Sequence, residues 1–244
     1  MAKKQARQVT LVCVTGVNIV KALYGLMVSA SRIKFDFIVL VTPKLPRARF
    51  RHFSIEKPIG SDLDSLDEYS KYILYNLYHH INTEFCLVVQ ADGYVLNGEL
   101  WCEEFREFDY IGAPWPIAAD KYIDPFGQHQ RVGNGGFSLR SKKLLLVPQR
   151  IRVPWEVNEG SFYRHFNQNS YSEDGNICVH NRHLFEKAGC KFAPLNIAMV
   201  FSRELDLQDF KFGPTFGFHK YRPDTTFVRR TIKQIKHFYK QLRK

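Results

Sequence analysis

The segment from Phe85 to Leu96 constrains the fold of this chain most, because it leads an uninterrupted apolar stretch into a carboxylate and a glycine. Residues 86–89 are all apolar, which is typical of a strand covered on both faces in an α/β protein. Ligands of open α/β sheets bind outside the carboxyl ends of the strands. Asp92 is therefore expected at a ligand-binding crevice, where Gly93 would allow close approach. The same pair is also typical of an ordinary turn.

The first part of the sequence alternates between strand-like and helix-like segments. Strands are predicted over residues 8–15 and 35–42, with a short one over 50–55, and helices over 18–33 and 64–81. This order predicts an α/β fold with a mostly parallel central sheet and right-handed crossovers.

The second part departs from that order. A short strand is predicted over 109–116, and a long loop over the residues up to Gln130. The segment Val132–Arg140 then places three glycines and an asparagine before an alternating strand. Its spacing matches neither the dinucleotide fingerprint nor a phosphate-binding loop. The glycines indicate either a backbone that approaches a sugar or phosphate closely, or a bulge.

The size of the chain predicts one domain, over residues 1–226, followed by a basic tail over 227–244. A chain of 244 residues with 45% hydrophobic content can bury a substantial core. Its five cysteines are scattered, which argues against a disulfide framework or zinc site and fits a reducing compartment. Neither a membrane-spanning run nor a signal-peptide pattern is visible, so a cytoplasmic protein is expected.

The C-terminal tail carries much of the net charge of +11. Its apolar residues recur at steps of three and four, which predicts an amphipathic helix with a cationic face: Val228, Ile232, Ile235, Tyr239 and Leu242. Such a helix could lie on anionic lipid at the inner face of a membrane, or dock on its own domain. The chain shows no nucleic-acid-binding motif, so no nucleic-acid partner is expected.

Six motifs occur in one order along the chain: Tyr69–Leu74, Glu84–Asn97, Asp109–Pro116, Val132–Arg140, Ser172–Asp174 and Phe216–His219. Together they resemble a bacterial family of GT-A-type glycosyltransferases. The resemblance covers roughly residues 8–221 and leaves the basic tail outside. It implies a Rossmann-like, three-layer GT-A sandwich whose metal motif follows a central strand.

The resemblance also implies a divalent cation, Mn²⁺ or Mg²⁺. The usual motif has two aspartates, whereas this chain has Gln90-Ala-Asp92. One carboxylate can suffice, because such cations are commonly held by one or two carboxylates together with substrate phosphates. By resemblance His219 is the second ligand, and Gln90 could help through its amide oxygen or a water. Two alternatives remain: a histidine that belongs only to an aromatic cluster, and a metal-independent site in which Lys or Arg neutralises the diphosphate.

The candidate general base is the acidic pair after Ser172. By comparison with inverting GT-A enzymes, Asp174 is the first choice and Glu173 the second. The alternative is a helix start, in which Ser172 is the N-cap and the acids favour the helix dipole.

The remaining candidates follow from their positions in the predicted fold. Thr15, Gly16 and Thr42 close strands and should border the nucleotide, unless they are ordinary turn residues. Asn134 and Gly135 are candidates for contacts with the donor or acceptor sugar. Trp115, between two prolines, could stack on a sugar or simply fill a corner.

The resemblance thus predicts a glycosyltransferase that moves a sugar from a nucleotide-sugar donor, UDP-linked, to a glycan or lipid-linked glycan in bacterial surface polysaccharide synthesis. One alternative is a sugar nucleotidyltransferase, although residues 14–18 lack the glycine-rich phosphate loop of that class. The other is a non-catalytic basic adaptor with a degenerate sugar-nucleotide pocket.

Overall fold

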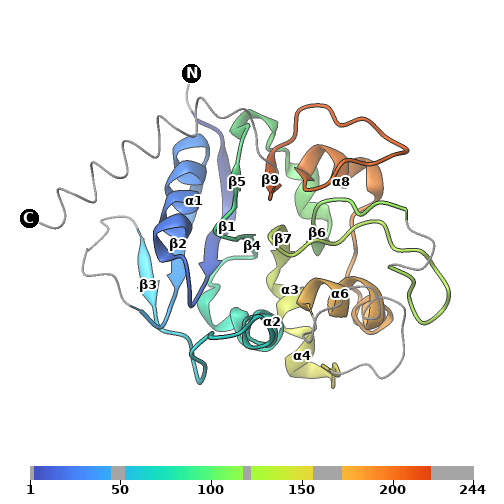
Figure 1. Cartoon of the computed structure of the whole chain (residues 1–244), viewed down its shortest axis with the longest axis horizontal. Coiled ribbons are helices and arrows are strands. Elements are labelled where there is room, and N and C mark those ends of the chain that lie inside the picture. The colour runs from blue at the N-terminus through green and yellow to red at the C-terminus, as the bar shows by residue number, and fades with distance from the viewer. Residues whose placement is uncertain (1–2, 45–52, 118–121, 156–171, 221–244) are drawn as a thin grey trace, which may run out of the picture.

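A six-stranded sheet forms the centre of the protein, with strand order β3-β2-β1-β4-β7-β6. The computed structural model describes residues 3–44, 53–117, 122–155 and 172–220 (Figure 1). The strands are β1 (Gln5–Val14), β2 (Lys34–Val41), β3 (Ser54–Glu56), β4 (Phe85–Val89), β6 (Tyr110–Ile111) and β7 (Phe137–Ser141). β7 runs antiparallel to both of its neighbours, and the other strands share one direction. The prediction of a mostly parallel sheet is confirmed.

The apolar strand β4 lies between β1 and β7, and each of its residues is buried. Its side chains alternate between the two faces of the sheet. Val88 packs in the same core cluster as Val12, while Leu87 packs with Leu11 in the cluster on the opposite face. The strand that precedes Asp92 is therefore central, as its composition predicted.

Helices cover both faces of this sheet (Figure 1). Apolar residues of α1 (Ile19–Arg32) and α8 (Leu195–Phe201) belong to the cluster of Leu11. The cluster of Val12 includes residues of α2 (Leu66–Tyr75), α3 (Lys142–Leu145), α4 (Val147–Arg150), the π-helical turn η4 (Asn176–His180) and α7 (Arg182–Lys187). The short helix α6 (Glu173–Gly175) leads into η4. The arrangement is the three-layer α/β sandwich that was predicted.

A second, three-stranded sheet continues from the end of β4. Its order is β5 (Gly93–Val95), β9 (Gly217–His219) and β8 (Ser202–Arg203). β5 pairs antiparallel with β9, and Gly93 lies opposite His219. β8 pairs in parallel with β9, so the residue after β8 emerges beside His219. This sheet brings β5 together with β8 and β9, which lie far from it in the sequence.

Three predicted elements differ in the structure. The helix expected over 64–81 ends at Tyr75 and is followed by a 3₁₀ turn, η1 (Leu77–His80), because Asn76 leaves the helical conformation with φ −125° and ψ −16°. The break turns Leu77 and His80 inward, where His80 Nε2 lies 2.6 Å from the Tyr72 hydroxyl. The strand expected over 109–116 is regular only in β6, and that over 50–55 lies at β3. The remaining 3₁₀ turns are η2 (Gly98–Leu100) and η3 (Glu103–Glu107).

The predicted tail helix over 227–244 and the domain boundary before it lie outside the described residues, and both stay predictions. The five cysteines are all free thiols. Among the helices that the structure describes, none has the length and apolar character needed to cross a membrane.

Burial of His180 predicts a specific loss of stability in acid. Burial lowers the pKa of this imidazole from its ordinary value of 6.5 to about 4. Between these pH values the unfolded chain binds a proton that the folded protein excludes, so the contribution of His180 is complete above pH 6.5 and declines as pH falls toward 4. We expect this part of the free energy of unfolding to be up to about 3 kcal/mol. Urea unfolding at several pH values should show a flatter dependence in His180→Gln, and parallel curves would contradict the prediction.

Candidate functional site

A pocket of about 350 Å³, lined by both apolar and polar residues, lies at the carboxyl ends of β1 and β4. Three segments form its wall: the turn after β1 with the start of α1, the start of α2, and the turn after β4. The lining residues are 14–18, 21, 63–66, 69 and 90–92. Thr15, Gly16, Gln90 and Asp92 are thus brought to one cavity. This is the place where open α/β sheets bind ligands.

Backbone packing fixes the shape of this pocket at Gly16. A Cβ atom on Gly16 would lie 2.2 Å from the carbonyl oxygen of Leu63, so a larger residue would push the start of α2 away. Ser65 caps the N-terminus of α2, and its hydroxyl accepts a hydrogen bond from the Glu68 backbone N–H. Thr15 is almost buried, and its hydroxyl contacts the backbone of Val17. The wall around the first strand end is therefore preformed.

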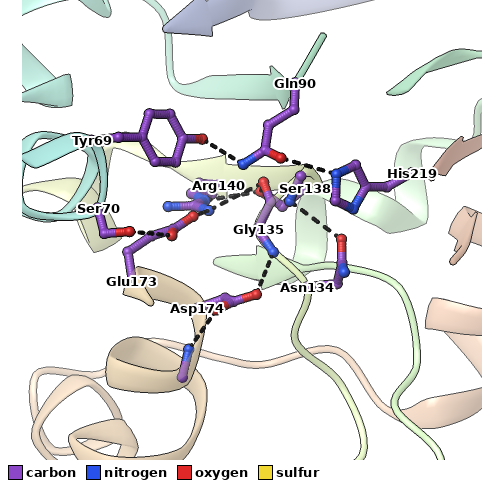
Figure 2. A network of polar contacts seen from close by, with 12 residues as sticks. Tyr69, Ser70, Gln90, Asn134, Gly135, Ser138, Arg140, Glu173, Asp174 and His219 are labelled. Atoms are coloured by element: carbon purple, nitrogen blue, oxygen red, sulfur yellow. Dashed lines mark hydrogen bonds and ion pairs between the residues drawn. The ribbon is translucent and has the colours of Figure 1, made fainter. Parts of the chain in front are cut away.

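Asp92, Gln90 and His219 converge at the edge of this pocket. Figure 2 shows the contact between Gln90 and His219. His219 Nε2 lies 2.9 Å from Gln90 Oε1 and 3.3 Å from Asp92 Oδ1. The amide nitrogen of Gln90 donates to the Tyr69 hydroxyl at 3.0 Å, which fixes the amide so that its oxygen faces the histidine. The side chain of His219 is 4% exposed and that of Asp92 54%. A buried imidazole therefore lies next to a solvent-accessible carboxylate.

The charges of this cluster perturb one another. The hydrogen bond from His219 lowers the pKa of Asp92 below its ordinary range, against the effect of partial burial. Burial acts to lower the pKa of His219, but its hydrogen bonds to Asp92 and Glu204 outweigh that effect and raise the pKa above 6.5. Asp92 and His219 therefore stabilise each other's charged forms.

The chemistry of this donor set fits a divalent cation. Within the described residues, no three His, Cys, Asp or Glu side chains form a group that could hold a metal ion. The group at this site instead combines one carboxylate, one imidazole and the Gln90 amide oxygen. These are ligand types that Mn²⁺ accepts, and phosphate oxygens of a substrate commonly complete such a site. Asp92, His219 and Gln90 are the residues that could hold such an ion.

Glu173, the second choice for a base, is buried in an ion pair with Arg140 (Figure 2). Glu173 Oε1 accepts from Arg140 Nη2 at 3.0 Å, and Oε2 accepts from the Ser70 hydroxyl at 3.5 Å. Their side chains are 4% and 0% exposed, respectively. Burial and the adjacent Asp174 carboxylate raise the pKa of Glu173. Both oxygens are thus engaged by protein groups, and almost none of the Glu173 side chain reaches solvent.

Asp174 is partly buried beside this pair. Its Oδ2 accepts from the Gly135 backbone N–H at 2.9 Å, and its Oδ1 accepts from the Gly175 N–H at 2.8 Å. The carboxylate is thus oriented by two backbone donors at the start of α6. It ties α6 to the glycine-rich loop before β7, and its remaining lone pairs can accept a proton.

The glycines of the glycine-rich loop lie against neighbouring protein groups. A Cβ on Gly135 would lie 2.0 Å from Glu173 Oε1, and one on Gly136 would lie 2.3 Å from the His219 ring. Asn134 is buried in a left-handed conformation, with φ 55°, and its amide contacts Glu204. Neither Asn134 nor Gly135 lines the pocket.

Three other residues predicted to contact the ligand are buried within the protein. Thr42 is fully buried, and its hydroxyl accepts from the Lys44 N–H at 3.4 Å. Gly93 is buried in β5 opposite His219. Trp115 is 4% exposed and stacks on Tyr122 with ring centroids 4.5 Å apart, so it fills the proline corner. None of these residues lines the pocket.

Sequence reasoning missed two residues of the network. Arg140 lies in the alternating strand after the glycine-rich segment, and nothing in the sequence indicates that it pairs with Glu173. Glu204 lies in a segment without any motif. Only the pairing of β8 with β9 shows that it lies beside His219.

The fold places the protein in the class of α/β proteins with GT-A-like architecture. The structure is similar to that of the galactosyltransferase LgtC in complex with donor and acceptor sugar analogs, with a TM-score of 0.58 and 10% identity over 93% of this chain and 95% of that one. An active-site mutant of LgtC gives a TM-score of 0.52 and 12% identity over 92% and 94% of the two chains. At these identities the similarity concerns the fold.

Within this class, the chain belongs to the family described as "Protein of unknown function (DUF5672)", whose sequence profile matches residues 53–219. The bifunctional IspDF of Campylobacter jejuni matches with 12% identity over 76% of this chain and 48% of its own, at a TM-score of 0.42 that is too low to support an argument. No curated protein sequence matches the chain.

Proposed function

We propose that this protein is a glycosyltransferase that moves a sugar from a UDP-linked donor to a glycan or lipid-linked glycan, with the help of Mn²⁺ or Mg²⁺. The convergence of Asp92, Gln90 and His219 at the edge of the strand-end pocket carries the proposal. The GT-A-like fold supports it, because the similar structure of LgtC is that of a galactosyltransferase with sugar analogs. The assembly of bacterial surface polysaccharide is the context that we propose for this activity.

In this proposal each part of the site has a separate task. The nucleotide occupies the pocket beside Thr15 and Gly16, with its diphosphate directed toward Asp92. Lys21, which also lines the pocket, adds positive charge next to the phosphates. Asp174 accepts the proton of the acceptor hydroxyl if the anomeric centre is inverted. The basic tail over 227–244 would hold the enzyme at the cytoplasmic face of a membrane, close to a lipid-linked acceptor.

Calorimetric titration of UDP, with and without Mn²⁺, tests the donor site. We expect Mn²⁺ to strengthen UDP binding in the natural protein, and Asp92→Ala to weaken the Mn²⁺-dependent binding by roughly 100-fold, because the exposed carboxylate is lost from the donor set. Glu107→Ala is the matched control, since it removes an exposed carboxylate that does not line the pocket.

Two results would count against this function. Equal UDP affinity in the natural protein and Asp92→Ala would remove the carboxylate from the donor site. Absence of UDP binding in both proteins, together with lipid binding that depends on residues 227–244, would favour a basic adaptor.

A further inference from the structure

Glu204 is a buried carboxylate to which the proposed function assigns no task. Its side chain is 9% exposed, although it follows the last residue of β8 in a loop. Its Oε1 lies 3.1 Å from His219 Nδ1 and 3.5 Å from the Lys220 ammonium, and its Oε2 accepts from the amide of Asn134. Both carboxylate oxygens of Glu204 therefore contact residues in or next to the cluster of Asp92, Gln90 and His219.

The chemistry of these contacts fixes which nitrogen of His219 faces the pocket. An ionised carboxylate only accepts hydrogen bonds, so the nitrogen beside Glu204, Nδ1, carries the hydrogen. The other nitrogen, Nε2, is the atom close to Gln90 and Asp92. A histidine that binds a metal through one nitrogen generally donates the hydrogen of its other nitrogen to a carboxylate or carbonyl, which orients the ring.

The backbone around Glu204 holds this arrangement in place. The parallel pairing of β8 with β9 sets the residue after Arg203 next to His219. Asn134, with φ 55°, and Lys220, with φ 54°, both adopt the left-handed conformation on either side of the carboxylate. This conformation is uncommon for residues other than glycine and is more favourable for asparagine than for lysine. Two such residues contact one carboxylate, which argues that its position is specified by the fold.

We propose that Glu204 is a positioning residue that orients His219 so that Nε2, Asp92 and the Gln90 amide oxygen form a prearranged half-site for a divalent cation. Asn134 in turn positions Glu204, because its amide donates a hydrogen bond to that carboxylate. The inference rests on the proposed function only in assuming that a cation binds. It predicts that removal of the Glu204 carboxylate weakens cation affinity although Glu204 would not touch the ion.

Mn²⁺ binding, followed by the electron paramagnetic resonance of the free ion, tests the inference. Glu204→Leu removes the acceptor and is expected to weaken Mn²⁺ binding by about 10–100-fold. Glu204→Gln keeps an acceptor oxygen but loses the charge, so its affinity should be intermediate, and it carries the test if the leucine variant does not fold. Asp206→Asn is the control, because it alters an exposed acid two residues away that pairs with Arg203.

A second readout separates positioning from general support of the fold. The Mn²⁺ bound to the natural protein should show magnetic coupling to an imidazole nitrogen, which is lost in His219→Ala and reduced in Glu204→Gln. Unchanged affinity and coupling in a folded Glu204 variant would overturn the inference and leave the proposed function intact. If the natural protein bound no Mn²⁺, with or without UDP, the cation-assisted function and this inference would both be wrong.

Discussion

Glu173→Leu is expected to lower the free energy of unfolding by about 3–5 kcal/mol, because it leaves the Arg140 guanidinium buried without its counter-charge. Arg140 is fully buried, and its other contacts are neutral: Ser138 Oγ at 2.9 Å, the Gly135 carbonyl at 3.5 Å and the face of the Tyr110 ring at 5.2 Å. A guanidinium cannot lose its proton inside a protein, so the charge cannot be removed by titration. Urea unfolding at pH 7 measures the loss.

Replacing the other partner, Arg140, should lower the free energy of unfolding less. Arg140→Met leaves Glu173, and burial already raises the pKa of that carboxyl, so it can become neutral by binding a proton. The double variant should recover part of the loss of Glu173→Leu, since burial of a pair is costly and an apolar replacement is tolerated. Equal losses in the two single variants would contradict this reasoning.

The matched control for this prediction is the exposed pair of Arg182 and Glu186. It has a similar separation, 2.8 Å, but the side chain of Glu186 is 49% exposed. Glu186→Leu should therefore cost less than about 1 kcal/mol. The comparison separates the effect of burial from that of an ion pair as such.

Asp174→Asn is expected to reduce sugar transfer by about 10²–10⁴-fold, the usual contribution of a general base. The asparagine has the shape of the aspartate but does not accept a proton at neutral pH. UDP affinity should stay close to that of the natural protein, because Asp174 does not line the donor pocket. The measurement is UDP release in the presence of acceptor, once UDP-sugars have been screened, with unfolding followed in parallel.

The relative effects at positions 173 and 174 decide between the two acids. Per folded molecule, Glu173→Gln should keep more activity than Asp174→Asn, because Glu173 has no access to a substrate. A larger loss of activity at position 173, in protein shown to be folded, would restore Glu173 as the base. Asp206→Asn again serves as the control for loss of an exposed carboxylate.

Much of the fold could be predicted because its main signals are local. The apolar run of β4 identified the central strand, and the alternation of strands and helices identified the parallel sheet. The break at Asn76 was missed because the apolar spacing continues through it into η1. The outcome at that position depends on contacts of His80 with Tyr72 in the preceding helix and with Glu56, which lies 24 residues away in the sequence.

The candidate site was predictable only in part, for a related reason. Asp92 was identified by its place after a strand, and Gln90 through the metal motif that the family resemblance implies. The structure places both on the pocket. Asn134 and Gly135 were read as sugar contacts because a glycine-rich segment leaves open what approaches it. In the structure Glu173 and His219 occupy that space. The roles of Arg140 and Glu204 could not be predicted, because their partners, Glu173 and His219, come close only in the folded protein.

The pairing of β5 with β9 also determines when the site can form during synthesis on the ribosome. Gln90 and His219 are 129 residues apart, so the cluster cannot assemble until β9 has been synthesised and has left the exit tunnel. Domains generally begin to fold from their N-terminal part during synthesis. The walls of the pocket, which come from residues 14–92, can therefore form early. A chain cut before β9 would keep the cavity-forming residues but lack His219.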